Sequence, residues 1–302
     1  MKKLAVLLAL CLGFLALQAQ EFEPTTEYYQ NGKKKSEGMM HLGLEMGHWQ
    51  YWDTEGKLIR EADYYKGQLH GTEILYFGNG KKQEETQYFG SMKHGMHSIW
   101  YETGNKKLEG FFTKGLKDSV WITYYPNGKP ELQVKYEAGL ARIIEFYNPN
   151  GEKTVAAGNG KMLRYYEYPN KLSEGSVENG FEQGQWTFYH ENGNVKETGN
   201  FDKGQRIGSW LEYYDTKQLK SEINYGNGKC VYFYRDGKKE MEGFMKDDEK
   251  DGEWTFWYTD GNIRSKNNYK KGIRHGLQEK YFSNGQLEIG RASCRERVYH
   301  PV

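Results

Sequence analysis

Short stretches rich in Tyr, Phe, Trp, Ile and Thr follow one another along almost the whole chain, and turn-forming residues separate them. This composition, with turn residues between the stretches, is typical of β-strands. Asn-Gly, or a variant of it, recurs between the stretches, and this dipeptide is a strong signal for a tight type I′ hairpin turn. The pattern therefore predicts an all-β chain made of hairpins.

The hairpins belong to a repeat with a period of 24 residues in most units. We call the second residue of each Asn-Gly turn, or its equivalent, the anchor of the unit. About twelve units result, the last of them incomplete. The anchors are Gly32, Gly56, Gly80, Gly104, Gly128, Gly151, Pro169, Gly193, Lys217, Gly237, Gly261 and Gly285.

Other residue types recur at fixed distances from the anchors. An aromatic residue stands four positions before every anchor, and Glu stands five positions after seven of the twelve. Gly-x-x-x-Gly follows and predicts a second, longer and more mobile turn. A Trp stands seven positions before the next anchor in five units, and because it is three residues from the other ring, the two point to opposite faces of the strand. These tryptophans are Trp49, Trp121, Trp186, Trp210 and Trp254.

This arrangement predicts an elongated antiparallel β-hairpin repeat array that forms a twisted ribbon or half-pipe. Rings of neighbouring units would stack on one another and stabilise it, without a central core. Composition agrees, because 37 Gly, 25 Tyr, 14 Phe and 8 Trp accompany few aliphatic residues. The formal net charge of +1 argues against a general nucleic-acid binder or a polybasic membrane-surface protein.

The two ends of the chain differ from the array. Residues 1–20 carry Lys2 and Lys3, then an apolar run, then a cleavage position after Ala19, which predicts a signal peptide. We therefore expect an exported protein, periplasmic, envelope-associated or secreted, with no transmembrane segment after cleavage. The repeat domain would cover residues 21–287. Residues 288–302 lose the glycine and tyrosine pattern and look like an aberrant tail of cloning or adaptor origin.

The full motif of a unit is Tyr-x-x-Gly-x-x-x-Gly-x-Trp-x-x-Tyr-x-x-Asn-Gly-x-x-x-x-Glu. It resembles the MORN repeat, specifically its bacterial variant, and the stretch from Phe201 to Tyr213 carries it clearly. Similar bacterial proteins are labelled as the antitoxin of a YwqK-type toxin-antitoxin system. The resemblance implies an assembly scaffold that contacts proteins or lipids, and not a catalyst.

The sequence offers no convincing catalytic, cofactor or metal motif. No Asn-Gly-Lys turn has the spacing of a nucleotide P-loop, and His190-Glu191 lacks the second His of a zinc protease. After the signal peptide is removed and the tail set aside, Cys230 is the one remaining cysteine, so a disulfide framework is excluded. The recurring glutamates suit cross-strand pairing with lysines, for which we expect Lys35, Lys107 and Lys196. We therefore expect no enzyme, no cofactor and no metal.

Three functions remain open. The leading hypothesis is an exported scaffold that binds a protein partner in the cell envelope or outside the cell. The alternatives are an antitoxin and a carbohydrate or cell-wall binder whose rings stack on sugars. The candidate interaction surface consists of Trp49, Trp121, Trp186, Trp210, Trp254, Tyr214 and Tyr258. The competing interpretation is that these rings simply hold the ribbon together.

Overall fold

The computed structural model describes residues 22–167 and 169–293. These residues form 24 strands of one antiparallel sheet. The predicted signal peptide lies outside the described residues, and within them no helix is long and apolar enough to cross a membrane. The strands are β1 (Glu23–Tyr28), β2 (Lys34–His41), β3 (Leu44–Trp52), β4 (Leu58–Tyr65), β5 (Gln68–Tyr76), β6 (Lys82–Phe89), β7 (Met92–Trp100), β8 (Lys106–Thr113), β9 (Leu116–Tyr124), β10 (Pro130–Glu137), β11 (Leu140–Tyr147), β12 (Lys153–Ala156), β13 (Asn159–Glu167), β14 (Asn170–Glu178), β15 (Phe181–Tyr189), β16 (Val195–Asp202), β17 (Gln205–Tyr213), β18 (Leu219–Tyr225), β19 (Asn227–Phe233), β20 (Lys239–Lys246), β21 (Glu249–Trp257), β22 (Ile263–Lys270), β23 (Ile273–Tyr281) and β24 (Leu287–Ser293).

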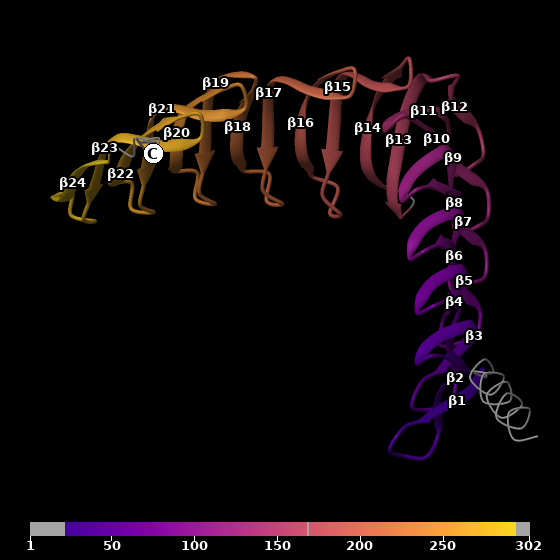
Figure 1. Cartoon of the computed structure of the whole chain (residues 1–302). Coiled ribbons are helices and arrows are strands. Elements are labelled where there is room, and N and C mark those ends of the chain that lie inside the picture. The colour runs from indigo at the N-terminus through magenta and orange to yellow at the C-terminus, as the bar shows by residue number, and fades with distance from the viewer. Residues whose placement is uncertain (1–21, 168, 294–302) are drawn as a thin grey trace, which may run out of the picture. The chain divides into compact units, whose positions relative to one another are not determined.

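The strands pair in the order of the chain, as a hairpin array requires. The chain divides into two units at Arg142 and Ile143. In the first, each strand from β1 to β10 pairs with the next, and in the second the same holds from β11 to β24. Figure 1 shows the hairpins of each unit following one another. The predicted all-β hairpin array is confirmed, and β24 extends its last ladder into the segment that we expected to stand apart.

The turn at the anchor is not the two-residue type I′ turn that we predicted. In the first repeat, the Gly32 amide donates to the Tyr29 carbonyl oxygen at 2.9 Å, and the Tyr29 amide donates to the Lys33 carbonyl at 2.8 Å. Gly32 has a φ of 78°, whereas Asn31 has no positive φ. This is a three-residue loop, a type I turn followed by a left-handed glycine. Asn31 instead links repeats, because its side-chain amide donates to the Thr54 carbonyl at 2.9 Å.

The second turn is the tight one, so the prediction that it is the longer turn is also wrong. His41 pairs directly with Leu44, and between them Leu42 and Gly43 have φ values of 54° and 74°, as a type I′ turn needs. The next glycine, Gly47, lies inside β3 with a φ of 67°. It marks a β-bulge at which the register of β2 and β3 shifts. Such a bulge redirects the side chains that follow it.

The bulge places the tryptophan ring of a repeat directly on a glycine of the preceding strand. A Cβ added to Gly38 would lie 2.3 Å from the Trp49 indole, so the missing side chain is what makes room for the ring. The same holds, at 2.1 to 2.3 Å, in four further pairs, with eleven residues separating glycine and tryptophan each time. These pairs are Gly110 with Trp121, Gly175 with Trp186, Gly199 with Trp210, and Gly243 with Trp254.

We call the side of the sheet that carries these five rings the tryptophan face. Its rings contact those of the neighbouring strands, as predicted; for example, Phe201 and Trp210 have centroids 5.0 Å apart in an edge-on arrangement. Cations cover the indoles from outside, with the guanidinium of Arg206 4.0 Å from the Trp210 centroid and Lys250 Nζ 4.2 Å from that of Trp254. A single sheet thus builds a row of buried residues, which corrects the expectation of an array without a core.

Candidate functional site

The five tryptophans of the candidate interaction surface are core residues. Their exposed fractions lie between 0 and 5%, so they do not form the exposed platform that we expected. Tyr214 and Tyr258 are half-buried. Their hydroxyls donate to the carbonyls of Phe233 and Tyr281 at 2.8 and 2.9 Å, which ties each repeat to the next. The site must therefore be sought on the opposite side of the sheet.

We call that opposite side the carboxylate face, because the recurring glutamates lie on it. In the repeat anchored at Gly104, the Glu109 carboxylate forms an ion pair with Lys106 Nζ at 2.5 Å. It also accepts a hydrogen bond from the hydroxyl of Tyr124 on the next strand. In the repeat anchored at Pro169, Lys171, Glu174 and Tyr189 repeat this arrangement. We call it the Lys–Glu–Tyr clamp.

The lysines of the clamp are not those that we predicted. Each stands three residues before its glutamate on the same strand, as Lys106 does, whereas Lys107 lies over the Tyr101 ring. Lys35 pairs with Glu27 of β1 instead of with the glutamate column. The loop at the anchor explains the difference, because its bulge shifts the register at the end of the hairpin and turns Lys106, the first residue of β8, towards the glutamate.

The clamp changes the acidity of its members. Burial by itself would raise the pKa of Glu109, but the hydrogen bonds from Lys106 and Tyr124 outweigh it, and the pKa is lowered. Burial and the neighbouring carboxylate together raise the pKa of Tyr124 to about 12. The clamp therefore favours a charged glutamate beside a neutral tyrosine.

These shifts predict how the stability of the array depends on pH. Glu109 contributes stability above its ordinary pKa of 4.5, and this is lost as the pH falls through the lowered folded value. Tyr124 contributes stability below its ordinary pKa of 10.0, and this is lost as the pH rises towards about 12. Thermal unfolding followed by circular dichroism should show both limbs. Glu109→Gln should flatten the acid limb and Tyr124→Phe the alkaline limb; unchanged limbs in both variants would contradict the clamp.

Other repeats lack part or all of the clamp, and in one of them the tyrosine is left without a hydrogen-bond partner among the described residues. In the repeat anchored at Gly193, Val195 stands in the place of the lysine and Thr198 in the place of the glutamate, while the tyrosine remains as Tyr213. The shorter side chains leave a hollow of about 560 Å³ over β15, β16 and β17. The residues that line it are Gln185, Thr187, Gly193, Asn194, Val195, Thr198, Tyr213 and Lys217.

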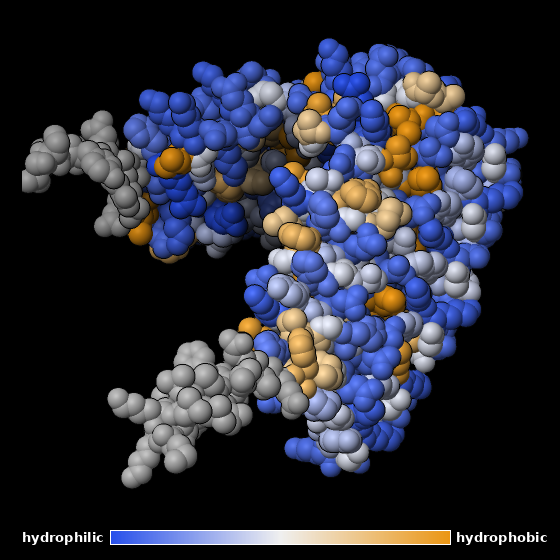
Figure 2. Space-filling view, turned by 45° about the vertical axis from the view of Figure 1, so that its right-hand side comes forward, coloured by the Kyte–Doolittle hydropathy of each residue, from blue (hydrophilic) through white to orange (hydrophobic). Residues whose placement is uncertain are grey.

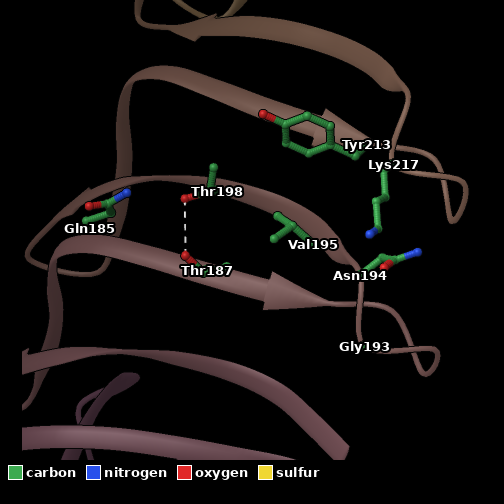
Figure 3. Close-up of a pocket in the computed structure, with 8 residues that line it drawn as sticks. All are labelled: Gln185, Thr187, Gly193, Asn194, Val195, Thr198, Tyr213 and Lys217. Carbon is green, nitrogen blue, oxygen red and sulfur yellow. Dashed lines mark hydrogen bonds between the residues drawn. The ribbon is translucent and has the colours of Figure 1, made fainter.

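Figure 3 shows the two ends of this hollow. At one end, Thr187 and Thr198 lie side by side with hydroxyl oxygens 3.3 Å apart, below the hydroxyl of Tyr213. At the other end, the ammonium group of Lys217 points towards Asn194 at the anchor turn. Within the described part of the chain, the side chains of Tyr213 and Lys217 have no hydrogen-bond or ion-pair partner.

Lys217 is itself an exception in the repeat. It has a φ of 72° at an anchor where ten other repeats place a glycine with positive φ. A side chain in the left-handed region costs about 1–2 kcal/mol, and glycine does not carry that cost. The chain thus holds a lysine with a left-handed backbone at the rim of its hollow, as it holds Lys203 and Lys271 at other turns.

We predict that Lys217→Gly stabilises the protein. Relief of the left-handed strain, less the greater chain entropy of glycine, leaves about 0.5–1 kcal/mol. The midpoint of urea unfolding should therefore rise. Lys203→Gly, at a type I′ turn where the residue also has a positive φ of 49°, serves as a comparison outside the hollow. A lower midpoint for Lys217→Gly alone would show that the lysine contributes contacts that outweigh its strain.

A second hollow of about 530 Å³ adjoins the first and shares Gln185 and Thr187 with it. Its lining includes Lys161, which is exposed and unpaired among the described residues, and Glu174, which its own clamp already holds. The described residues contain no group of three or more His, Cys, Asp or Glu side chains that could hold a metal ion. Cys230 is buried as a free thiol. The two hollows can therefore recognise a ligand through hydroxyl, amide and ammonium groups.

The departures that create the hollow are visible in the sequence. Val195 and Thr198 stand in columns that hold Lys in six of the twelve repeats and Glu in seven, and Lys217 replaces an anchor glycine. The glycine partners of the tryptophans recur at a fixed spacing too, eleven residues before each Trp, but the spacing alone does not show that the two residues touch. The hollow thus lies where Val195 and Thr198 differ from the residue types that recur at their positions in the repeat.

The fold and the two faces define a class of protein: an array of β-hairpin repeats in which each repeat is fastened to its neighbours and side chains on one open face are free to bind. Six stretches match the MORN repeat variant family, at residues 69–89, 117–138, 182–203, 206–227, 250–271 and 274–289. The chain is a MORN repeat protein, and such repeats generally serve as protein- or membrane-binding scaffolds.

Comparison with characterised proteins adds little beyond this family. No curated protein matches the chain. Among solved structures, the chain is similar to one described as "Crystal Structure of TcdB2-TccC3-TEV", with 11% sequence identity and a TM-score of 0.19. The similar region covers 93% of this chain and 19% of that one.

Proposed function

We propose that the protein is an exported, non-catalytic scaffold that binds a protein partner in the cell envelope or outside the cell. The observation that carries the proposal is the difference between the two faces of the sheet. The tryptophan face is closed by its own rings and cations, while the carboxylate face offers hollows with unpaired polar side chains. A recognition surface on a repeat array is suited to holding a partner.

Export is the part of the proposal that rests on the sequence of residues 1–20. Expression of the full chain in a bacterial host, followed by fractionation and mass spectrometry, tests it. The expected result is an envelope or secreted form whose N-terminus is Gln20. Retention of the whole chain in the cytoplasm, with residues 1–20 still attached, would contradict export.

Partner binding is tested separately in the source organism. Chemical cross-linking of intact cells, followed by purification of the tagged protein, should recover the same envelope or extracellular protein in replicate samples. Recovery should persist when tryptophan-face cations are replaced, as in Lys250→Gln, because we place the partner on the other face. A well-folded bait that captures no protein would overturn the proposal.

The two alternatives gain less support. Carbohydrate binding was motivated by rings that stack on sugars, and the five tryptophans that were to supply them are 0 to 5% exposed. The antitoxin alternative has no structural feature in its favour, and the absence of rescue in co-expression with a neighbouring toxin gene would remove it. A protein partner therefore remains the function that the surface supports best.

A further inference from the structure

We propose that the hollow around Thr198 binds the carboxylate of an aspartate or glutamate side chain presented by the protein partner. This ligand carboxylate takes the place that the repeat glutamate occupies in the Lys–Glu–Tyr clamp. The inference rests on the proposed function and deepens it, since it assigns the chemical group that the scaffold recognises.

The first argument is the comparison of this repeat with its neighbour in the same chain. In the neighbouring clamp, the Tyr189 hydroxyl donates to Glu174, and Lys171 approaches the same carboxylate at 3.0 Å. In the repeat of the hollow, Tyr213 is present and its hydroxyl has no acceptor among the described residues, because Thr198 is too short to replace the glutamate. The Tyr213 hydroxyl is therefore a donor for which this repeat supplies no carboxylate acceptor.

The lining of the hollow also carries an unpaired positive charge. Among the described residues that line the hollow, Lys217 alone is charged. The nearest carboxylate along the chain, that of Asp215, is paired with Arg235 at 2.9 Å, and this arginine holds the pKa of Asp215 below its ordinary value. Lys217 is thus left without a counter-ion, and from the end of the hollow opposite the Tyr213 hydroxyl its charge attracts an anionic ligand into the hollow. An ammonium group with an unpaired positive charge attracts a carboxylate more strongly than a neutral ligand.

The third argument is the shape and lining of the hollow. Its volume of about 560 Å³ accommodates a side chain together with part of the backbone that bears it. Val195 offers an apolar contact for the methylene groups of such a side chain, and the amides of Gln185 and Asn194 can pair with the adjoining peptide. Lys161 in the adjoining hollow favours a second acidic residue in the same partner segment.

The test uses the purified protein and fluorescein-labelled acetyl-tetraglutamate amide as probe, with binding followed by fluorescence anisotropy. The matched peptide acetyl-tetraglutamine amide controls for charge, and an oligoglucuronate distinguishes a sugar carboxylate from a peptide one. The expected result is saturable binding of the glutamate peptide, with at least about tenfold weaker binding of both others.

Variants locate the binding in the hollow. Tyr213→Phe should weaken binding about tenfold, the loss of one charge-assisted hydrogen bond from a half-buried hydroxyl. Lys217→Gly should weaken it by a smaller factor, about two- to fivefold, because the Lys217 side chain is exposed. The double variant Val195→Lys/Thr198→Glu introduces the clamp of the repeats anchored at Gly104 and Pro169 and should abolish binding while thermal stability stays at or above that of the parent protein. Tyr189→Phe, which alters an occupied clamp, should leave binding unchanged.

The inference is overturned if the glutamate peptide does not bind, if the glutamine peptide or the oligoglucuronate binds as tightly, or if the clamp-restoring double variant still binds. The proposed function fails by a different result, the absence of any cross-linked partner with the parent protein. If the double variant captures the same partner from cells as efficiently as the parent, the scaffold function stands and the carboxylate site does not.

Discussion

Gly199→Ala is expected to lower the stability of the array by about 1–3 kcal/mol or more, although the change adds a single methyl group. The added Cβ would lie 2.3 Å from the indole of Trp210, which is 2% exposed. The ring must leave its place or the two strands must separate. The midpoint of urea unfolding measures the loss, and hydrogen exchange should show it concentrated in β15 to β18.

Gly78→Ala is the matched control. Gly78 also lacks a left-handed φ, and a Cβ built there has no neighbour within 4 Å. We expect a change within about 0.5 kcal/mol for this variant, as for an ordinary surface substitution. Equal effects of the two substitutions would show that loss of glycine flexibility, and not contact with the indole, sets the stability.

Trp210→Ala should have the largest effect of any single substitution considered, about 3–5 kcal/mol. The variant loses the buried ring, the hydrogen bond from its Nε1 to the Asn200 carbonyl at 3.1 Å, and the cover that Arg206 provides. Chemical unfolding followed by far-ultraviolet circular dichroism measures the change, since ellipticity does not depend on the tryptophan that is removed.

The pair Gly199 and Trp210 also allows a double-mutant cycle. In the absence of the indole, the methyl group of Gly199→Ala enters the space that the ring has left, so it should cost little or even stabilise. A coupling free energy of about 0.5–3 kcal/mol is the expected sign of direct contact. Additive effects of the two substitutions would contradict the interlocking of ring and glycine.

Much of this fold was predictable, because a repeat presents the same evidence many times. The spacing of Trp49 and Trp52 placed their rings on opposite faces, and the strands follow the predicted hairpins. The turn types were not predictable, since Asn-Gly suits both a type I′ turn and a three-residue loop, and only the strand register decides between them. Burial of the tryptophans depended on glycines such as Gly38, whose importance is evident only when the facing strand is known.

The candidate site was less accessible to sequence reasoning. Tyr213 is indistinguishable from the other aromatic residues of its column, and it becomes notable only because Thr198 leaves its hydroxyl without an acceptor. Lys217 stands out in the sequence at an anchor position, but only the structure shows that its side chain lies at the rim of a hollow. A single-chain pattern identifies columns well, but it does not show which neighbours a missing side chain leaves unsatisfied.

The exposed Lys–Glu–Tyr clamp has a consequence for how such proteins acquire specificity. An exposed ion pair contributes about 0–1 kcal/mol, so a repeat can lose its lysine and glutamate with little harm to the rest of the array. The loss leaves a tyrosine donor free where no other acceptor is near, as at Tyr213, whereas the Tyr281 hydroxyl donates to Glu279 of its own strand. Substitutions at two positions of one repeat can therefore create or remove a binding site on the carboxylate face, while the strand pairing of the array stays the same.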